Sequence, residues 1–355
     1  MIPDRITRAH LLQALAHIDT HGVPRGRASR HYELLHDHIR YPPKYAVALA
    51  AELATGSQLP SDTFGGGKET NDFLRRLGFT IVRKGDSPQP LRVAVISLRA
   101  AGARVEKRAL RQAVAAARND YDGRLLCLFS GVSSHWSSNP DAFRTLLQRH
   151  RASALAELSF PEGARYVGLD ASLTDFLPQR VRQRLAGGSE ATRHPERVAQ
   201  ILAECEPGGP RRFPLEGLQV GVIVCGENNL LRSCQSEGNA CKGIRHHPGV
   251  PLLPGTDIVL NGAHTIMGNW DKINKRFAWI SQHHRLLAYT TNNTNKRAWG
   301  TALRVFYNGQ RVADGNGIRI DNGHKWPFVP QLVASNDWRL VLLDRFTPPL
   351  RPGTP

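Results

Sequence analysis

The pattern of hydrophobic and polar positions divides the chain into a short first part and a longer second part. In the first part, apolar residues recur at helical spacing over residues 6–18, 45–54 and 73–77, which predicts three short helices followed by a strand at 80–82. In the second part, short apolar runs alternate with amphipathic stretches. This pattern predicts strands at 91–98, 124–129, 165–169, 218–225, 257–261, 286–291, 301–307, 311–313 and 338–344, and helices at 105–119, 141–151 and 270–284. Alternation followed by a β-rich end is typical of an α/β sheet domain with added antiparallel strands.

A polar, proline-containing segment at 86–90 lies between the two parts and predicts a linker. We therefore expect a small, mostly helical domain at 1–85, an α/β domain at 91–346 and a C-terminal tail at 347–355. Asp4 is the expected N-cap of the first helix, and Asn308-Gly309 is a hairpin signal between two of the late strands.

The longest apolar run of the second part, 218–225, ends in Cys225, Gly226 and Glu227. A run of this kind predicts a strand buried on both faces, and it places the thiol at the carboxyl edge of the sheet. A cysteine there is a nucleophile if a neighbouring base or cation holds it as a thiolate. The alternative is a buried structural cysteine.

Composition limits the class of protein. The chain has 355 residues, and its five cysteines are an odd number and scattered, which argues against a disulfide framework and for a reducing, cytoplasmic setting. No apolar stretch reaches the roughly 18 residues that span a bilayer. The histidines near the N-terminus lack metal-ligand spacing with cysteine, so we expect neither a metal nor another cofactor.

The net charge of +17 points to a polyanionic partner, and DNA is the partner we expect. The excess of arginine and lysine is spread over most of the chain and forms no dense tract. An arginine-rich composition imposed by a GC-rich genome would give the same charge, so charge alone does not decide.

A series of short motifs in the first part points to a known domain. The motifs are His31-Tyr32-Glu33-Leu34, Tyr41-Pro42-Pro43-Lys44, Phe64-x-Gly66-Gly67 with Thr70-Asn71, and Phe73-Leu74-x-x-Leu77-Gly78-Phe79. This series resembles the N-terminal head domain of McrA-type restriction endonucleases. The resemblance implies a role in DNA recognition, restriction and antiphage defence, but no HNH nuclease pattern is present.

If this domain contacts DNA, its basic side chains are the expected phosphate contacts: Arg25, Arg27, Arg30, Arg40, Lys44 and Lys68. The glycine-rich loop at 64–71 opens a helix and offers backbone N–H groups to a phosphate, although its spacing is not that of a P-loop. The alternatives are an ordinary solvated face and a plain turn.

Landmarks in the second part follow the order of another family. They are the strand at 91–96, the strand 218–225 with Cys225, the strand at 257–261, Trp270, Arg276 and the strand with turn at 302–309. This order resembles the nitrilase, or carbon–nitrogen hydrolase, superfamily. The resemblance implies an αββα sandwich, a homodimer, and a Glu-Lys-Cys triad in which a thiolate attacks, a glutamate transfers the proton and a lysine stabilises the oxyanion.

Compared with that triad, only the cysteine is present, as Cys225. Gly131 stands in the place of the glutamate, and Arg182 stands in the place of the lysine, with Glu190 as the second carboxylate of that motif. Glu162 lies too close to Arg182 in the sequence to be the missing base. Either hydrolysis is lost, or another group supplies the base: Glu190, Glu227, His135 or His264. The carboxylates can instead simply pair with arginines.

The sequence thus predicts a DNA-associated, restriction-type defence protein whose nitrilase-like domain has a degenerate triad. One alternative is an active carbon–nitrogen hydrolase that uses Cys225 on a small molecule or a modified base. The other is a binder of nucleotides or modified bases without catalysis.

Overall fold

A computed structural model describes most of the chain. The described residues are 2–3, 5–36, 39–57, 63–84, 91–99, 103–131, 140–158, 165–169, 181–263, 269–292, 299–319 and 326–346. The chain forms two compact units, Met1–Gln89 and Pro90–Pro348, which we call the head unit and the larger unit. The expected linker and the C-terminal tail lie outside the described residues.

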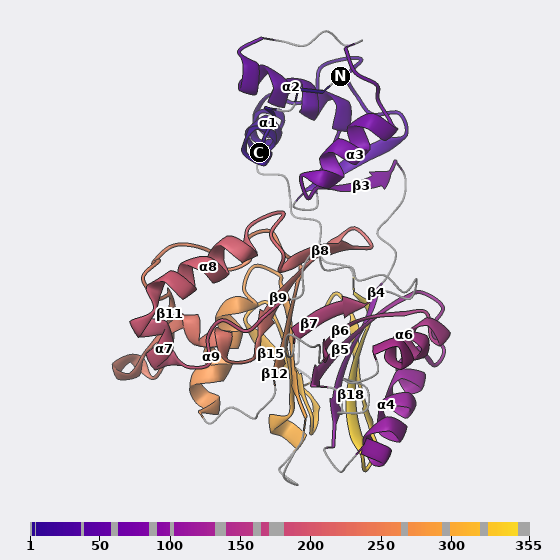
Figure 1. Ribbon diagram of the computed structural model, residues 1–355, viewed down its shortest axis with the longest axis vertical. Helices are drawn as coiled ribbons and strands as arrows, with labels where there is room; N and C mark the ends of the chain where they lie inside the picture. The colour runs from indigo at the N-terminus through magenta and orange to yellow at the C-terminus, as the bar shows by residue number, and fades with distance from the viewer. Residues whose placement is uncertain are drawn as a thin grey trace. The chain divides into compact units, whose positions relative to one another are not determined.

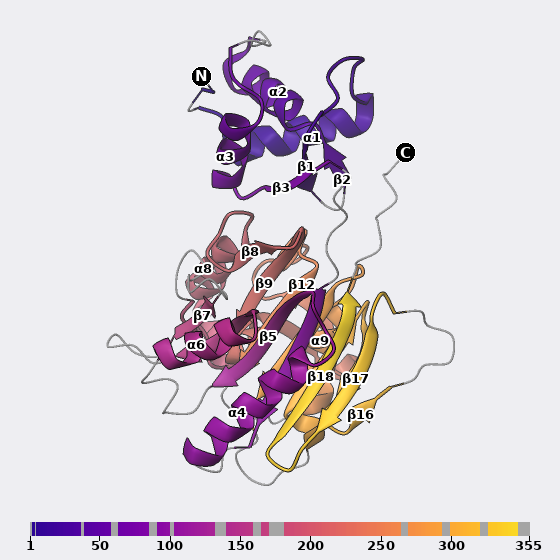
Figure 2. The same cartoon turned by 90° about the vertical axis from the view of Figure 1, so that its right-hand side faces the viewer.

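The head unit combines three helices with a small antiparallel sheet (Figure 2). The expected helices are confirmed as α1 (Arg8–His21), α2 (Pro43–Thr55) and α3 (Lys68–Arg76). The sheet has the order β2-β1-β3, from β1 (Tyr32–His36), β2 (Ile39–Tyr41) and β3 (Thr80–Arg83). Only β3 was expected, because β1 and β2 are short and show no alternating apolar pattern.

The core of the head unit forms between α1, α2 and the sheet. Leu11 and Leu15 of α1 pack with Val47 of α2, and Pro43 begins α2 where its missing N–H costs nothing. The expected N-cap of α1 is wrong. Thr7 is the cap, and its side chain accepts a hydrogen bond from the backbone N–H of His10.

The described part of the larger unit contains two large sheets and a two-stranded sheet of β10 (Leu231–Cys234) and β11 (Ala240–Ile244). The six-stranded sheet has the order β17-β18-β4-β5-β6-β7, and the seven-stranded sheet has the order β16-β15-β14-β13-β12-β9-β8. The first is built from β4 (Leu91–Leu98), β5 (Arg124–Gly131), β6 (Ala152–Leu158), β7 (Arg165–Leu169), β17 (Val329–Ala334) and β18 (Trp338–Phe346). The second is built from β8 (Arg212–Leu215), β9 (Leu218–Val224), β12 (Ile258–Ala263), β13 (Leu286–Thr291), β14 (Leu303–Tyr307), β15 (Gln310–Asp314) and β16 (Gly317–Ile318).

The sheets pack face to face, and helices cover both outer faces (Figure 1). Leu126 and Leu128 of β5 meet Val222 of β9 and Leu260 of β12 in the core between the sheets. Helices α4 (Ala103–Arg118) and α6 (Pro140–Arg149) pack on the outer face of the six-stranded sheet. Helices α8 (Pro195–Cys205) and α9 (Trp270–Ile280) pack with the outer face of the other sheet. The expected αββα sandwich is therefore confirmed.

The strand register brings the carboxyl ends of three strands together. β12 pairs in parallel with β9 on one side and with β13 on the other. As expected, β9 is buried along most of its length, but it ends at Val224, one residue before the predicted end at Cys225. The hairpin prediction also holds, because Asn308 and Gly309 join β14 to β15 with positive φ angles of 47° and 80°. In the described part of the chain, no helix has the length and apolar character needed to cross a bilayer.

Candidate functional site

Cys225 lies on a sharp turn between strand and helix. β9 ends at Val224, and the 3₁₀ helix η1 (Cys225–Leu230) begins at the cysteine itself. Cys225 has a φ of 44°, a left-handed conformation that is uncommon for a residue other than glycine. A strained strand-to-helix turn of this kind is one way in which proteins expose a nucleophile at the carboxyl edge of a sheet. The side chain is half-buried between the two layers that flank the seven-stranded sheet.

Glu227 fixes the turn from inside. Its side chain is fully buried, and its oxygens accept hydrogen bonds from the backbone N–H of Arg184 at 2.7 Å and of Val224 at 3.0 Å. Arg211 donates to the same carboxylate through Nη1 at 2.5 Å and Nη2 at 3.1 Å. Four N–H donors from three residues therefore hold this carboxylate, and the geometry gives Glu227 a positioning role.

A second carboxylate completes this charge network. Glu204 of α8 accepts from Arg184 at 2.7 Å and from Nε of Arg211 at 2.7 Å. Burial lowers the pKa of Arg211, but the charges of Glu227 and Glu204 outweigh burial, and the net pKa is raised. Arg211 is completely buried and its charge is compensated, which is what a structural ion pair requires.

Glu190 and Arg182 flank the same turn but do different things. One oxygen of Glu190 accepts from the backbone N–H of Ala186 at 2.7 Å, and the other is paired with Arg197. Arg182 has an exposed side chain, and only its backbone oxygen joins the network, accepting from Arg211 at 3.2 Å. Its neighbour Val181 takes the buried place between the sheets. The role of Arg182 as an oxyanion-binding cation therefore stays a prediction.

A carboxylate that no sequence motif indicated lies beside the place of the missing base. Gly131 ends β5 and is opposite Glu157 of β6 in the strand register. Glu157 is only 7% exposed, and it shares its face of β6 with Leu155 of the core between the sheets. Across that core, β12 packs against both β5 and β6. In the sequence, Glu157 is a glutamate inside an apolar run, which could have indicated a functional residue. No strand was predicted at β6, however, so the residue was missed.

Polar groups near Cys225 are left with hydrogen-bonding capacity. Tyr289 of β13 is fully buried, and burial together with the neighbouring Cys225 raises its pKa. Within the part of the chain that the structure describes, the Tyr289 hydroxyl and Oδ1 of Asn261 have no hydrogen-bond partner, and the two residues are opposite each other in the register. The histidines proposed as bases, His135 and His264, lie outside the described residues, as does Glu162.

A second arginine holds the other side of the turn. Arg276 of α9 is 1% exposed, and it donates to Oδ1 of Asn229 at 2.7 Å and to Oγ of Ser233 at 3.1 Å. Asn229 in turn donates to the backbone oxygen of Gly226 at 2.8 Å. Burial and the nearby Arg245 lower the pKa of Arg276 to about 10.

The other buried cysteines are poor nucleophiles. Burial raises the pKa of Cys127 and of Cys205 to about 12, so both stay as thiols at neutral pH. Among the residues described, no three histidine, cysteine or acidic side chains gather as metal ligands would.

The head unit contains a pocket of about 500 Å³. Its lining comes from three segments that are distant in the sequence: residues 26–32, residues 42–45 at the start of α2, and residues 66–67 and 70–71 at the start of α3. Tyr32 and Tyr45 supply aromatic surface, and Arg27, Arg30 and Lys44 supply positive charge. Gly67 has a φ of 79°, which suits glycine and sets the start of α3.

Of the expected DNA contacts, this pocket brings together Arg27, Arg30 and Lys44. Arg25 and Lys68 are exposed but do not line it. Arg40 also does not line it, and its guanidinium is paired with Glu33 at 2.7 Å.

Asn71 is a further pocket residue. It is 3% exposed, and in the described structure its Oδ1 has no hydrogen-bond partner. The neighbouring Thr70, by contrast, donates to the backbone oxygen of Gly65 at 2.7 Å. A buried amide oxygen without a partner is costly, and a ligand in the pocket could satisfy it.

Comparison with solved structures gives amidases from Nesterenkonia. The amidase from Nesterenkonia sp. has 13% identity and a TM-score of 0.42, and the match covers 74% of this chain and 92% of that one. A cysteine-to-alanine mutant, described as an amidase from the nitrilase superfamily, has 13% identity and a TM-score of 0.42, with coverage of 73% and 92%. At this level of similarity, the comparison transfers no residue and no activity to this chain. Comparison with curated proteins gives no match.

The head unit has a clearer relationship. Residues 4–83 match the family model described as ScoMcrA-like, N-terminal head domain, and this range holds all three helices, all three strands and the whole pocket. Residues 4–83 of the head unit are therefore similar to that N-terminal head domain.

Proposed function

We propose that this protein binds DNA as part of a restriction-type defence against foreign DNA in the cytoplasm, and that the head pocket is its point of contact. The observation that carries the proposal is the convergence of Arg27, Arg30 and Lys44 on a single pocket of a ScoMcrA-like head domain. Cations supply the salt-sensitive affinity for phosphates, whereas aromatic and amide groups contact bases.

The size and lining of the pocket suit one nucleotide of a strand. About 500 Å³ accommodates a base with its sugar and phosphate but not a duplex. Tyr32 and Tyr45 offer surfaces for stacking, and Asn71 offers an amide for the edge of a base. These features also favour the alternative of a nucleotide or modified-base binder, which differs from the main proposal in not needing a DNA strand.

The test is a salt-dependent gel-shift titration with duplex and single-stranded DNA. The double variant Arg27→Gln/Lys44→Gln should lose about tenfold or more in affinity, and its salt dependence should be shallower by about two released counterions. Arg76→Gln is the matched control, because Arg76 is an exposed cation of the same unit outside the pocket. If the wild type has no DNA affinity at low salt, the proposal is wrong. Binding of free nucleotides alone would favour the alternative.

For the larger unit we propose a supporting role without hydrolysis, in which the homodimer expected from the nitrilase resemblance presents two head units. Gly131 at the place of the base and the engaged carboxylate of Glu227 support a loss of catalysis. Analytical ultracentrifugation tests the dimer, and a monomer at micromolar concentration would remove it from the proposal.

The φ of Cys225 favours a second candidate function, a carbon–nitrogen hydrolase. In this candidate, Cys225 attacks an amide or nitrile carbon, Glu157 accepts and returns the proton, and Tyr289 donates to the developing oxyanion. Ammonia release from small amides, lost in Cys225→Ala and reduced by about 10²–10⁴-fold in Glu157→Gln, would establish it over the non-hydrolytic role. No release above the Cys225→Ala background would exclude it for the amides tested.

A further inference from the structure

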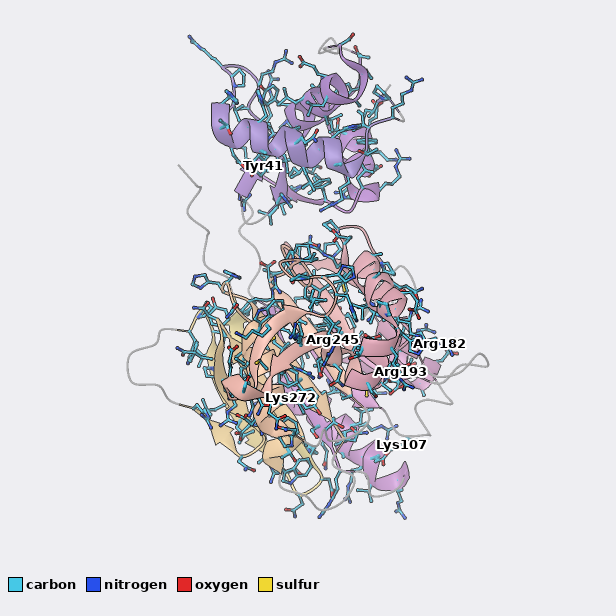
Figure 3. All side chains as sticks on the ribbon, turned by 90° about the vertical axis from the view of Figure 1, so that its left-hand side faces the viewer. Tyr41, Lys107, Arg182, Arg193, Arg245 and Lys272 are labelled. Carbon is cyan, nitrogen blue, oxygen red and sulfur yellow. The ribbon has the colours of Figure 1, made fainter. Side chains whose placement is uncertain are left out.

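Three cations gather beside the Cys225 turn. Lys272 and Arg276 are four residues apart on α9, so they lie on the same face of that helix. Arg245 follows directly after β11 (Ala240–Ile244), which packs against α9. Figure 3 shows Arg245 and Lys272 on one face of the larger unit, together with Arg193.

Neutral groups fix two of these cations in place. Asn229 accepts from both arginines, through Oδ1 from Nη1 of Arg276 at 2.7 Å and through its backbone oxygen from Nε of Arg245 at 3.2 Å. Arg245 also donates to Oγ1 of Thr192 at 3.2 Å. Within the described residues, Arg245, Lys272 and Arg276 form no ion pair with a carboxylate, and Nη2 of Arg276 has no acceptor.

The positive charge of this cluster is therefore uncompensated. Burial lowers the pKa of each of the three groups, and repulsion by neighbouring cations lowers it further. Arg232 acts in this way on Arg245, and Arg245 acts on Arg276. Arg276 and Arg245 together act on Lys272. An anion placed among these groups would relieve both the repulsion and the missing hydrogen bond.

We propose that Arg245, Lys272 and Arg276 form a binding site for a phosphate group. Two guanidinium groups and one ammonium group offer several N–H donors, which suits the oxygens of a phosphate. Arg276 provides a fixed buried charge, while Arg245 and Lys272 are half-buried and remain open to a ligand. The phosphate belongs either to a nucleic-acid strand or to a free nucleotide, which present the same chemistry.

The proposed phosphate site is linked to the Cys225 turn by hydrogen bonds. Asn229, which both arginines hold, donates to the backbone oxygen of Gly226 at 2.8 Å. A bound phosphate would thus stiffen the turn that carries Cys225. This inference does not depend on the head pocket, because every residue of the site belongs to the larger unit.

Equilibrium dialysis of the full chain with radiolabelled inorganic phosphate, at constant ionic strength, tests the site. We expect saturable binding of one phosphate per chain, weakened about tenfold or more in Arg245→Gln and in Lys272→Gln. Lys275→Gln is the matched control, because Lys275 lies on the same helix and is already paired with Asp271 at 3.3 Å. It removes the same charge and should leave phosphate binding unchanged. Lys272 has no side-chain hydrogen bond in the described structure, so its variant keeps the test valid if Arg245→Gln does not fold.

Competition then identifies the source of the phosphate. Displacement of the label by duplex or single-stranded DNA assigns the site to a strand, and displacement by a nucleoside monophosphate alone assigns it to a free nucleotide. The proposal is overturned if phosphate does not saturate, if Lys275→Gln weakens binding as much as Lys272→Gln does, or if neither competitor displaces the label. DNA binding that depends on the head pocket, together with no saturable binding of phosphate, would overturn this inference and leave the proposed function in place.

Discussion

Two buried arginines hold opposite sides of the Cys225 turn, and their charges are treated in opposite ways. Arg211 reaches the turn through Glu227 and is compensated by two carboxylates, so its pKa is raised. Arg276 reaches the turn through Asn229, has only neutral acceptors, and its pKa is lowered to about 10. Both side chains are almost completely inaccessible to solvent.

This difference in charge compensation distinguishes a structural arginine from one that is available to a ligand. A buried charge that is satisfied by its own chain leaves nothing for a ligand, and its removal mainly affects folding. A buried charge that neutral groups hold retains its attraction for an anion. The Arg211 side of the turn is therefore a rigid support, and the Arg276 side is the one on which a ligand would act.

The largest effect should come from breaking the compensated pair. Arg211→Met leaves Glu227 and Glu204 without their shared cation, and we expect it to lower the free energy of unfolding by about 3–5 kcal/mol in urea titrations. The control is the double variant Arg211→Met/Glu227→Leu, which removes both charges and should recover a substantial part of the loss. A single variant as stable as the wild type would mean that the pair does not hold the turn.

The room for a side chain at glycine positions also differs between the Arg211 side and the Arg276 side of the turn. A Cβ added at Gly226 would lie 2.3 Å from the backbone oxygen of Ala186, whereas one at Gly188 would make ordinary contacts with Nη2 of Arg245 at 3.5 Å and Oδ1 of Asn229 at 3.9 Å. We expect Gly226→Ala to cost about 2–3 kcal/mol and Gly188→Ala to be close to neutral, as measured by thermal unfolding. Equal losses in the two variants would contradict the contrast between a rigid and an open side.

The hydrophobic pattern predicted the strand that carries Cys225 better than it predicted the polar residues around the thiol. The run that became β9 is apolar because both of its faces are buried, and this alone places Cys225 at the sheet edge. Pairing of Glu227 and Glu190 with arginines was one of the alternatives, and the structure confirms it with Arg211 and Arg197. The network around Arg211 was not predicted, because Arg184, Glu204 and Glu227 come from separate segments that only the fold brings together. Glu157 was missed because a strand of small residues such as β6 shows little periodicity.

In the head unit, too, the sequence indicated the domain but not which of its basic residues line the pocket. Motifs indicated the domain and six basic residues, but nothing in the spacing distinguished Arg27, Arg30 and Lys44, which line the pocket, from Arg40, which is paired with Glu33. Which cations remain available depends on contacts that form only on folding: the pocket joins segments distant in the sequence, and the Arg40–Glu33 pair joins β2 to β1.

Removing the uncompensated arginine should cost less than removing Arg211. Arg276→Met loses the hydrogen bonds to Asn229 and Ser233 but also removes a buried charge without a counterion, so we expect a loss of about 2 kcal/mol in urea. Phosphate at constant ionic strength should stabilise the wild type and not this variant. A loss as large as that of Arg211→Met would show that Arg276 is also a purely structural residue.

The smallest expected effect is a difference in reactivity between two cysteines, one beside Arg211 and the other beside Arg276. Cys205, beside Arg211, is buried with a pKa raised to about 12, whereas Cys241, beside Arg276, is half-buried with a pKa that burial raises. In native protein at pH 8, iodoacetamide should therefore modify Cys241 and spare Cys205, and mass spectrometry of peptides would show which is labelled.

The same thiol predicts a pH dependence. The folded state keeps the proton of Cys205 up to about pH 12, whereas the unfolded chain releases it above about pH 8.5. The stability linked to this proton is thus fully present below pH 8.5 and is lost as the pH rises toward 12, by on the order of 1 kcal/mol between pH 8.5 and 9.5. Cys205→Ala removes this titrating thiol, so the stability of the variant should fall less steeply over that interval. Parallel curves for the two proteins, or labelling of Cys205 as fast as Cys241, would mean that the Arg211 side opens as readily as the Arg276 side.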